Sequence, residues 1–460
     1  MSKNFSHRYA FGAWINDTRN SALPTEQWPS KILDDETEDG IRLCLDLQKI
    51  VGFNGYFVFG LFATYAWNPD IPQTVDSERM TRVKRIIDYA HETGIKINLG
   101  LGVYSWGFDA IIANDPAVQG TNPHAMCLSS DASWQWMKKI LDYILDNYEF
   151  DGFHLEASDQ GRCHCPKCAH YSDFAYYSRA NTLCADYIRS KKADAILLVN
   201  ACGYKEWGTY LDDEADYQEI IKMSGHIDCF IDNGNLFGGY IHGEYRKRIV
   251  KDIRCAFGTS GGSWFYMPQR WDKLRWFLPY VKRTCNYLKD LYIQGGRAVE
   301  FYMGATINPG CEMNIYCGGR ILSDPGLSVD DLMFEAAGEL YGPDSPAVQQ
   351  AVADLFSKAE EAYYDSWNKE FEAKKFVGEI SIEPLFGTEP GIPHYLDVER
   401  RLPWKWVYMT PEGRLAYKSR LNAILETIPE LITRVREKEK MARIITCVKN
   451  VITDIDSFGD

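Results

Sequence analysis

Strand-like and helix-like segments alternate along the first two thirds of this chain, and this rhythm constrains the fold more than any other feature. Strands that alternate with helices pair in parallel, and eight such units are the number that closes a barrel. The spacing Met80, Val83, Ile86, Ile87 and Ala90 is typical of the intervening helices, with one buried face. The expected strands are Tyr9–Ile15, Gly55–Gly60, Lys96–Val103, Gly152–Glu156, Ile196–Ala201, Ile227–Asp232, Ser263–Met267 and Ala298–Met303.

An open, doubly wound sheet is the alternative arrangement of such units. A sheet of that kind usually carries a glycine-rich phosphate loop after its first strand, and this sequence has none there. We therefore predict an α/β fold, a (β/α)₈ TIM barrel over residues 1–325. After about Pro325 the strand signal stops, and helical periodicity continues at Leu327–Tyr341, Ser345–Asn368 and Pro411–Ala442. Residues 326–460 are predicted to form a mostly helical C-terminal domain.

The charge balance limits the kinds of partner that this chain binds. Its formal net charge is −14, whereas proteins that bind polyanions usually present a basic face, so we expect no nucleic acid. The sequence has no run of about 18 apolar residues, so we expect no membrane span. The first residues contain no apolar stretch of signal-peptide length, and the 13 scattered cysteines do not resemble a disulfide framework. These features favour a reducing, cytoplasmic location.

Carboxylates occur near the ends of three expected strands, where barrel enzymes place their active sites. Side chains alternate along a strand. In the strand that ends at Glu156, the apolar alternate residues are expected to face the helices, which turns His154 and Glu156 toward the barrel axis. Asp232 ends the sixth expected strand, on the face opposite its apolar neighbour. Glu300 shares a face with Tyr302 in the last strand.

Paired carboxylates at a barrel mouth suit the cleavage of glycosidic bonds. One protonated acid assists the leaving oxygen, and a second carboxylate activates water, attacks the sugar or stabilises the cationic transition state. We assign the acid to Glu156 and the second carboxylate to Asp232, with Asp159 and Glu300 as further candidates. A contact with a sugar hydroxyl or an arginine is the more natural role for Glu300. For each of these carboxylates a structural ion pair is the alternative.

Other polar and aromatic side chains near strand ends suit sugar recognition, because aromatic rings stack on the C–H face of a sugar and amides bind its hydroxyls. For each of them the alternative is a place in the core. The candidates for substrate binding are Glu300, Asp159, His154, Trp14, Asn16, Tyr104, Trp106, Asn200, Tyr204, Asn233, Trp264, Tyr266, Tyr302 and Asn308.

A cysteine-rich loop follows the proposed acid directly. Cys163, Cys165 and Cys168, with His170 nearby, have the character of zinc ligands. The second cysteine pair of a zinc ribbon is missing from the sequence. A packed loop with reduced thiols, a structural metal site and a redox role therefore all stay open, and under each of them the loop is expected to shape the active site.

A family resemblance rests on residues 150–168, which read FDGFHLEASDQGRCHCPKC. This stretch resembles barrel glycosidases related to α-glucuronidases and β-N-acetylhexosaminidases, in particular the endo-β-N-acetylglucosaminidase type. In those enzymes the fourth strand ends in acidic residues and a short Cys-x-Cys-x-x-Cys loop follows. Residues 334–342, FEAAGELYG, resemble the helical domain after such barrels. The resemblance implies an acid/base role for Glu156.

One departure from that family concerns the mechanism. Hexosaminidases that use the substrate's own N-acetyl group usually carry adjacent Asp-Glu at this place, whereas Leu155 and Ala157 flank Glu156 here. An N-acetyl-directed mechanism would therefore need Asp232 or Asp159 as the polarising group.

Three hypotheses about function follow from these patterns. The favoured one is a glycoside hydrolase with a carbohydrate substrate, possible action on N-acetylhexosaminides and no cofactor, apart from the structural zinc left open above. The second is a metal-assisted barrel hydrolase or lyase that uses His154, His164 or His170 with carboxylates. Against it, the sequence has no clear His-x-His or His-Glu-x-x-His pair. The third is a carbohydrate-binding barrel without catalysis.

Overall fold

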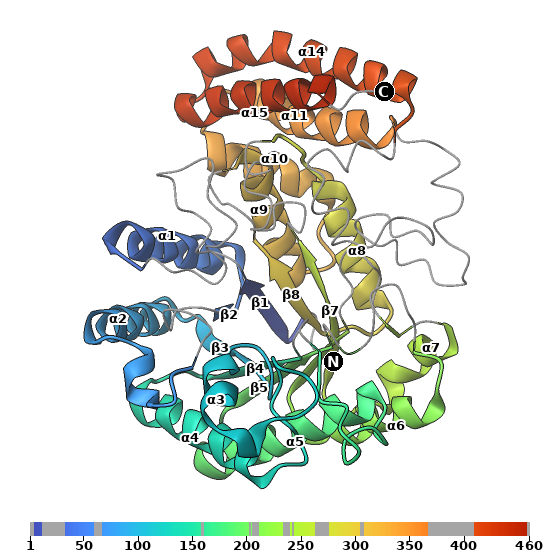
Figure 1. Cartoon of the computed structure of the whole chain (residues 1–460). Helices are drawn as coiled ribbons and strands as arrows, with labels where there is room; N and C mark the ends of the chain where they lie inside the picture. The colour runs from blue at the N-terminus through green and yellow to red at the C-terminus, as the bar shows by residue number, and fades with distance from the viewer. Residues whose placement is uncertain are drawn as a thin grey trace.

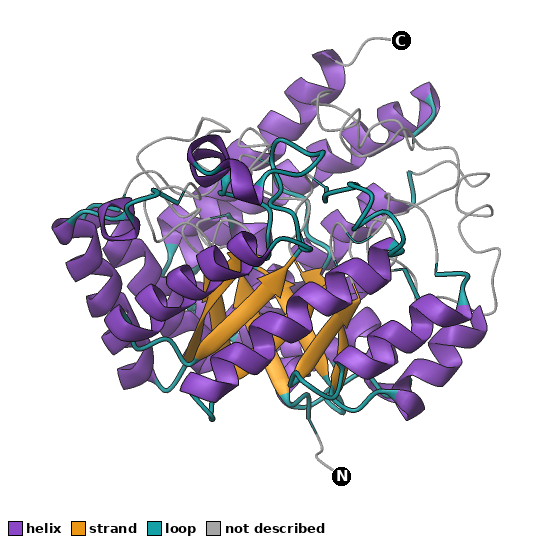
Figure 2. Ribbon diagram, turned by 60° about the horizontal axis from the view of Figure 1, so that its bottom comes forward, coloured by secondary structure: helices purple, strands orange, loops and turns teal. Residues whose placement is uncertain are grey.

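The described part of the protein contains a closed barrel of eight parallel strands that follow one another in sequence order. The computed structural model describes residues 4–11, 33–58, 67–157, 161–201, 204, 211–232, 240–241, 243–262, 276–303, 308–366 and 409–457. Figure 2 shows the strands at the centre, with helices around them. The strands are β1 (His7–Phe11), β2 (Gly55–Val58), β3 (Lys96–Gly102), β4 (Gly152–Glu156), β5 (Ile196–Asn200), β6 (Cys229–Asp232), β7 (Ala256–Gly262) and β8 (Ala298–Tyr302). The predicted (β/α)₈ barrel is confirmed.

The seventh strand differs from its prediction. We expected it at Ser263–Met267, which lies outside the described residues, and β7 instead occupies Ala256–Gly262. Its sequence, AFGTSGG, has few of the large apolar residues that identify a strand. Close packing explains one of its glycines, because a Cβ on Gly258 would lie 2.0 Å from the carbonyl oxygen of Ala298 in β8. Such glycines weaken the sequence signal of a strand that nevertheless pairs with β6 on one side and with β8 on the other.

Amphipathic helices cover the outside of the barrel, and α2 shows why they form. Its N-cap Asp76 accepts a hydrogen bond from the backbone N–H of Arg79 at 2.7 Å. Gly94 ends the helix in the left-handed conformation, with φ 79°. The helices between strands are α1 (Asp35–Val51), α2 (Ser77–Thr93), α3 (Asp109–Asn114), α4 (Asp131–Asn147), α5 (Asp173–Lys191), α6 (Glu214–Met223), α7 (Gly243–Asp252) and α8 (Val281–Ile293).

The described residues after 325 are helical, as the sequence predicts. In sequence order, α9 packs against the barrel, α10 packs on α9, and α11 packs on α10 and α8. Figure 1 shows α14 and α15 beyond them, at the end of the molecule opposite α4 and α5. The bounds are α9 (Pro309–Ser323), α10 (Val329–Tyr341), α11 (Pro346–Tyr364), α14 (Pro411–Arg434) and α15 (Lys438–Ser457). In the described ranges, every helix is too short or too polar to cross a bilayer.

A buried carboxyl joins this helical region to the barrel. Glu360 of α11 is 3% exposed and accepts hydrogen bonds from the backbone N–H groups of Lys282 and Arg283, at 3.0 and 2.9 Å. It therefore caps the N-terminus of α8 from another helix. Burial raises the pKa of Glu360 from 4.5 to about 7, although the two backbone hydrogen bonds act in the opposite direction.

This raised pKa predicts how stability depends on pH. Between pH 4.5 and about 7 the folded protein holds a proton on Glu360 that the unfolded chain has lost, so the free energy of unfolding should fall as pH rises. A shift of this size corresponds to a fall on the order of 3 kcal/mol. Glu360→Gln should remove this part of the pH dependence in urea unfolding measured across that window. Identical pH profiles for the variant and the wild type would contradict the assignment.

Candidate active site

β4 carries Glu156 to the C-terminal end of the barrel, where loops surround the mouth. Glu156 pairs in register with Gly102 of β3 and Asn200 of β5. Its residue is 8% exposed, whereas His154, two positions earlier on the same face, is 0% exposed. Glu156 is thus the point at which this buried strand meets the mouth, as the sequence predicts.

A layer of buried polar side chains lies inside the barrel beneath the mouth. Glu300 of β8 accepts a hydrogen bond through Oε2 from Nδ2 of Asn200 at 2.6 Å. The same oxygen lies 3.4 Å from Nε2 of His154. The neighbouring strands β4 and β5 and the last strand, β8, therefore bring His154, Asn200 and Glu300 together. All three are almost completely buried.

His154 is a neutral member of this layer. Its ring lies edge-on to Phe57 of β2, with centroids 4.0 Å apart. Burial lowers the pKa of His154 to about 3, because a charged imidazole would lose its hydration. The side chain therefore stays uncharged at neutral pH and offers one N–H donor and one acceptor.

A strained turn follows β3 beside Glu156. Tyr104 and Trp106 have φ values of 65° and 72°, which bulky residues rarely adopt. The turn folds back closely over the end of β3. A Cβ on Gly102 would lie only 2.3 Å from the carbonyl oxygen of Ser105, so this position has no room for a side chain. Strain of this kind persists only where the surroundings hold it in place, and it clusters at functional sites.

The loop before α4 holds this turn. The backbone N–H of Met126 donates to the carbonyl oxygen of Tyr104 at 2.7 Å, and Ser105 forms an antiparallel bridge with Ala125. Tyr104 is buried, while the Trp106 side chain stays partly exposed. Of the two aromatic residues, Trp106 is therefore the one that keeps part of its side chain accessible to solvent.

Asp232 lies on the outer face of the sheet and not toward the axis. Its register partner Thr259 shares a hydrogen bond of 2.6 Å with the hydroxyl of Tyr287 in α8. Arg246 of α7 lies near the Asp232 carboxylate. Burial lowers the pKa of Arg246, and the negative charge of Asp232 acts in the opposite direction. The Asp232 oxygens accept hydrogen bonds from the backbone N–H groups of Tyr240 and Ile241, at 2.8 and 3.2 Å.

This position corrects the expectation that Asp232 faces Glu156 across the mouth. Cys229 pairs in register with Leu198 of β5, two residues before the inward-facing Asn200, which places Cys229 on the inner face. Three residues later, Asp232 is on the other face. Both faces of a barrel strand are buried, so the pattern of apolar residues in β6 does not tell inside from outside.

Two further candidates for sugar binding, Tyr204 and Asn308, are buried and bonded to other parts of the protein. Tyr204 is fully buried, stacks on Tyr177 with centroids 5.0 Å apart, and accepts a hydrogen bond from the Asn181 side chain. Asn308 is the N-cap of α9 and also donates to the carbonyl oxygen of Trp276 at 2.7 Å. Both residues therefore fit the alternative of a place in the core better than a role in sugar binding.

For seven of the predicted substrate-binding residues, the side chain lies outside the described part of the protein. Tyr302 ends β8, but its side chain lies outside the described part of the protein. Trp14, Asn16, Asp159, Asn233, Trp264 and Tyr266 lie outside the described residues altogether.

The cysteine loop meets a partner that the local motif does not reveal. Cys163, Cys165 and Cys168 gather with Cys127, and the four sulfur atoms lie within 4.8 Å of one another. Cys127 comes from the loop that precedes α4, in the connection from β3 to α4, so only the fold brings it to the motif. His170, the predicted fourth member, is exposed and packs on the ring of Tyr171 at a centroid distance of 3.9 Å.

The buried imidazole gives a direct test of the polar layer. In NMR spectra of the histidine-labelled protein, the ring signals of His154 should not change between about pH 5 and pH 8, because its pKa lies far below that window. His154→Gln identifies the signals by their disappearance. Titration of this ring within the window would mean that the imidazolium form is stabilised inside the barrel, contrary to the arrangement described above.

A solved glycoside hydrolase shares this fold. A GH138 enzyme targeting pectin rhamnogalacturonan II matches with a TM-score of 0.61 and 10% sequence identity, over 99% of this chain and 71% of that one. An O-GlcNAc hydrolase of Thermobaculum terrenum matches with a TM-score of 0.49 and 11% identity, over 98% of this chain and 82% of that one. No family model matches the sequence, and no curated protein matches it. The similarity establishes a barrel architecture that glycoside hydrolases also use.

Proposed function

We propose that this chain is a glycoside hydrolase in which Glu156 is the general acid. The observation that carries the proposal is the position of this carboxyl group. It stands at the C-terminal end of β4, in register with Gly102 and Asn200, where a buried polar layer meets the mouth of the barrel. Active sites of this fold lie at that end of the strands.

The surroundings of Glu156 suit an acid. A carboxyl group that is 8% exposed loses much of the hydration that stabilises its charged form. A general acid must hold a proton until the leaving oxygen needs it. Glu300, hydrogen-bonded to Asn200 beneath the mouth, is too deeply buried to meet a sugar, so we assign it a positioning role.

Trp106 supplies the proposed contact with the sugar ring. It follows β3 in the strained turn beside Glu156 and keeps part of its side chain exposed. A flat aromatic surface next to an acid binds the apolar face of a pyranose and aligns the glycosidic oxygen with the proton donor. The proposed substrate is a carbohydrate, and the sequence resemblance makes N-acetylhexosaminides the first class to assay.

The second carboxylate is proposed to come from a residue other than Asp232. Asp232 is held by two backbone N–H groups on the outer face of β6. Asp159, three residues after Glu156 in the sequence and outside the described residues, is the remaining candidate among those predicted to face the substrate. A carboxylate at either the nucleophile or the water-activating position would complete the chemistry.

Glu156→Gln tests the acid. The variant should fold normally and lose hydrolysis of unactivated glycosides by about a hundredfold or more, because general acid catalysis is typically worth that much. Aryl glycosides with good leaving groups need little protonation, so their rates should fall much less. Near-wild-type rates on an unactivated glycoside would rule out this role, and a wild type that binds but cleaves none of a panel of aryl glycosides would favour the non-catalytic alternative.

Carboxylate-to-amide variants at two positions test which residue supplies the second catalytic carboxylate. Asp159→Asn should slow substrates with good and poor leaving groups alike, whereas Asp232→Asn should change the rate of the folded protein little and mainly lower its melting temperature. The measurement is the hydrolysis rate alongside a thermal unfolding curve for each variant. Loss of activity in Asp232→Asn with an unchanged melting temperature would restore Asp232 as a catalytic candidate.

A further inference from the structure

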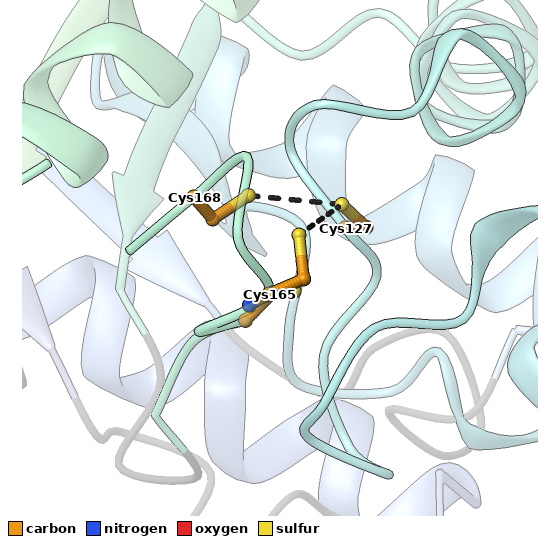
Figure 3. Close-up of side chains that lie close together, drawn as sticks. Cys127, Cys165 and Cys168 are labelled. Carbon is orange, nitrogen blue, oxygen red and sulfur yellow. Dashed lines mark hydrogen bonds between the residues drawn. The ribbon is translucent and has the colours of Figure 1, made fainter. Parts of the chain in front are cut away.

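Four cysteines from two loops face one another beside the proposed active site. Figure 3 shows the sulfur atoms of Cys127, Cys165 and Cys168 directed toward a common point, and Cys163 completes the group. We propose that these four residues bind one zinc ion as a structural tetrathiolate site. The inference does not depend on the glycoside hydrolase proposal.

The distances between the sulfur atoms fit such a site. The Cys127 sulfur lies 3.6 Å from the sulfurs of both Cys165 and Cys168. Zinc–sulfur bonds of about 2.3 Å in tetrahedral geometry place two sulfurs roughly 3.8 Å apart. A disulfide bond would require about 2.05 Å. The sulfurs are therefore spaced as ligands of a shared ion, and one thiol approaches two others at once, which no single disulfide explains.

The ligand set indicates the type of metal and its role. Four sulfur ligands in a tetrahedral arrangement select zinc, or iron as the competing metal. Four protein ligands also leave no open position for water or substrate, which is the pattern of structural zinc. Cys127, Cys163 and Cys168 are buried and Cys165 is partly exposed, so the site is enclosed yet close enough to the surface for the ion to enter.

Groups around the sulfurs orient them. The hydroxyl of Ser129 lies 3.2 Å from the Cys168 sulfur, and the backbone N–H of Cys165 donates to the Cys163 sulfur at 3.4 Å. Gly120 leaves the room that Cys163 needs, because a Cβ there would lie 2.3 Å from its sulfur. Hydrogen bonds to metal-bound sulfur and a fitted cavity are the second layer that tunes a metal site.

A buried arginine fixes the backbone of the cysteine loop. Arg162 donates to the carbonyl oxygens of Cys163 and Cys168, at 3.2 and 3.3 Å, and to that of Tyr171 at 2.8 Å. Zinc with four thiolates carries a net charge of about −2, since each thiol releases its proton to solvent on binding. The guanidinium is already paired with a carboxylate, because its Nε lies 2.6 Å from Oδ1 of Asp173, so its part in the site is to hold the loop backbone. It also draws the ends of the cysteine loop together before the ion binds.

The ion would connect the two loops that shape the mouth. Cys127 follows Met126, whose N–H holds the carbonyl oxygen of Tyr104 in the strained turn. The other three ligands belong to the loop that follows Glu156 in the sequence. A zinc ion at this point therefore ties the loop after β3 to the loop after β4 and supports the backbone strain beside the proposed acid.

Metal analysis of the full chain tests the proposal. Protein produced with zinc in the medium and purified under reducing conditions should contain about one zinc per chain. Cys127→Ser and Cys168→Ser should lose this zinc, whereas Cys255→Ser and His170→Ala should retain it as matched controls. Cobalt(II) in place of zinc should give the thiolate charge-transfer band and the visible bands of a tetrahedral sulfur site. Ser129→Ala should weaken zinc binding by about tenfold or more.

Several outcomes would overturn the proposal. These are a wild type without stoichiometric zinc, retention of zinc in Cys127→Ser, loss of zinc in His170→Ala, or a disulfide between two of the four cysteines under reducing conditions. Stoichiometric iron would overturn the metal assignment. If the cysteine variants fail to fold, the metal content and cobalt spectrum of the wild type still decide. Metal content is read without any activity assay, so failure here and failure of the proposed hydrolase are separate results.

Discussion

Closure of the barrel forces each strand residue to face either the axis or the surrounding helices, and the rest of the site depends on this choice. His154, Asn200 and Glu300 face inward from three strands and meet within hydrogen-bonding range or close to it. Asp232, at the end of β6, faces outward instead, and backbone N–H groups hold its carboxylate. The fold thus places similar carboxylates in different surroundings without any difference in their own chemistry.

The inward layer explains why Glu156 can stand at the mouth. A polar side chain in a barrel core is costly unless it is hydrogen-bonded, and Glu300 meets this condition through Asn200. Neutral His154 avoids adding a charge next to it. Glu156 then ends a strand whose inner face also carries His154, which lies between the hydrogen-bonded Glu300 and the ring of Phe57.

The sequence was enough to predict the barrel, the helical region after it and the position of Glu156, because these depend on repeated local patterns. It placed β7 wrongly because AFGTSGG is a strand held by close backbone packing and not by large apolar residues. It placed Asp232 on the wrong face because β6 is buried on both sides. Cys127 could not be assigned from a local motif, since only the neighbouring positions of the loops after β3 and β4 bring it to Cys163.

The same two loops explain how strain can persist beside an active site. The left-handed backbone at Tyr104 and Trp106 costs on the order of 1–3 kcal/mol per residue, so the turn would relax if only its own residues held it. Contacts from Met126 and Ala125 oppose that relaxation, but they come from another irregular loop. That loop is held in turn by the segment after α3: Gln119 forms an antiparallel bridge with Met126, and the backbone N–H of Cys127 donates to the carbonyl oxygen of Val118 at 2.9 Å. The zinc site proposed at Cys127 would add a further anchor at the same point. On this argument the cysteine group belongs to the architecture of the mouth, even though no cysteine has to touch the substrate.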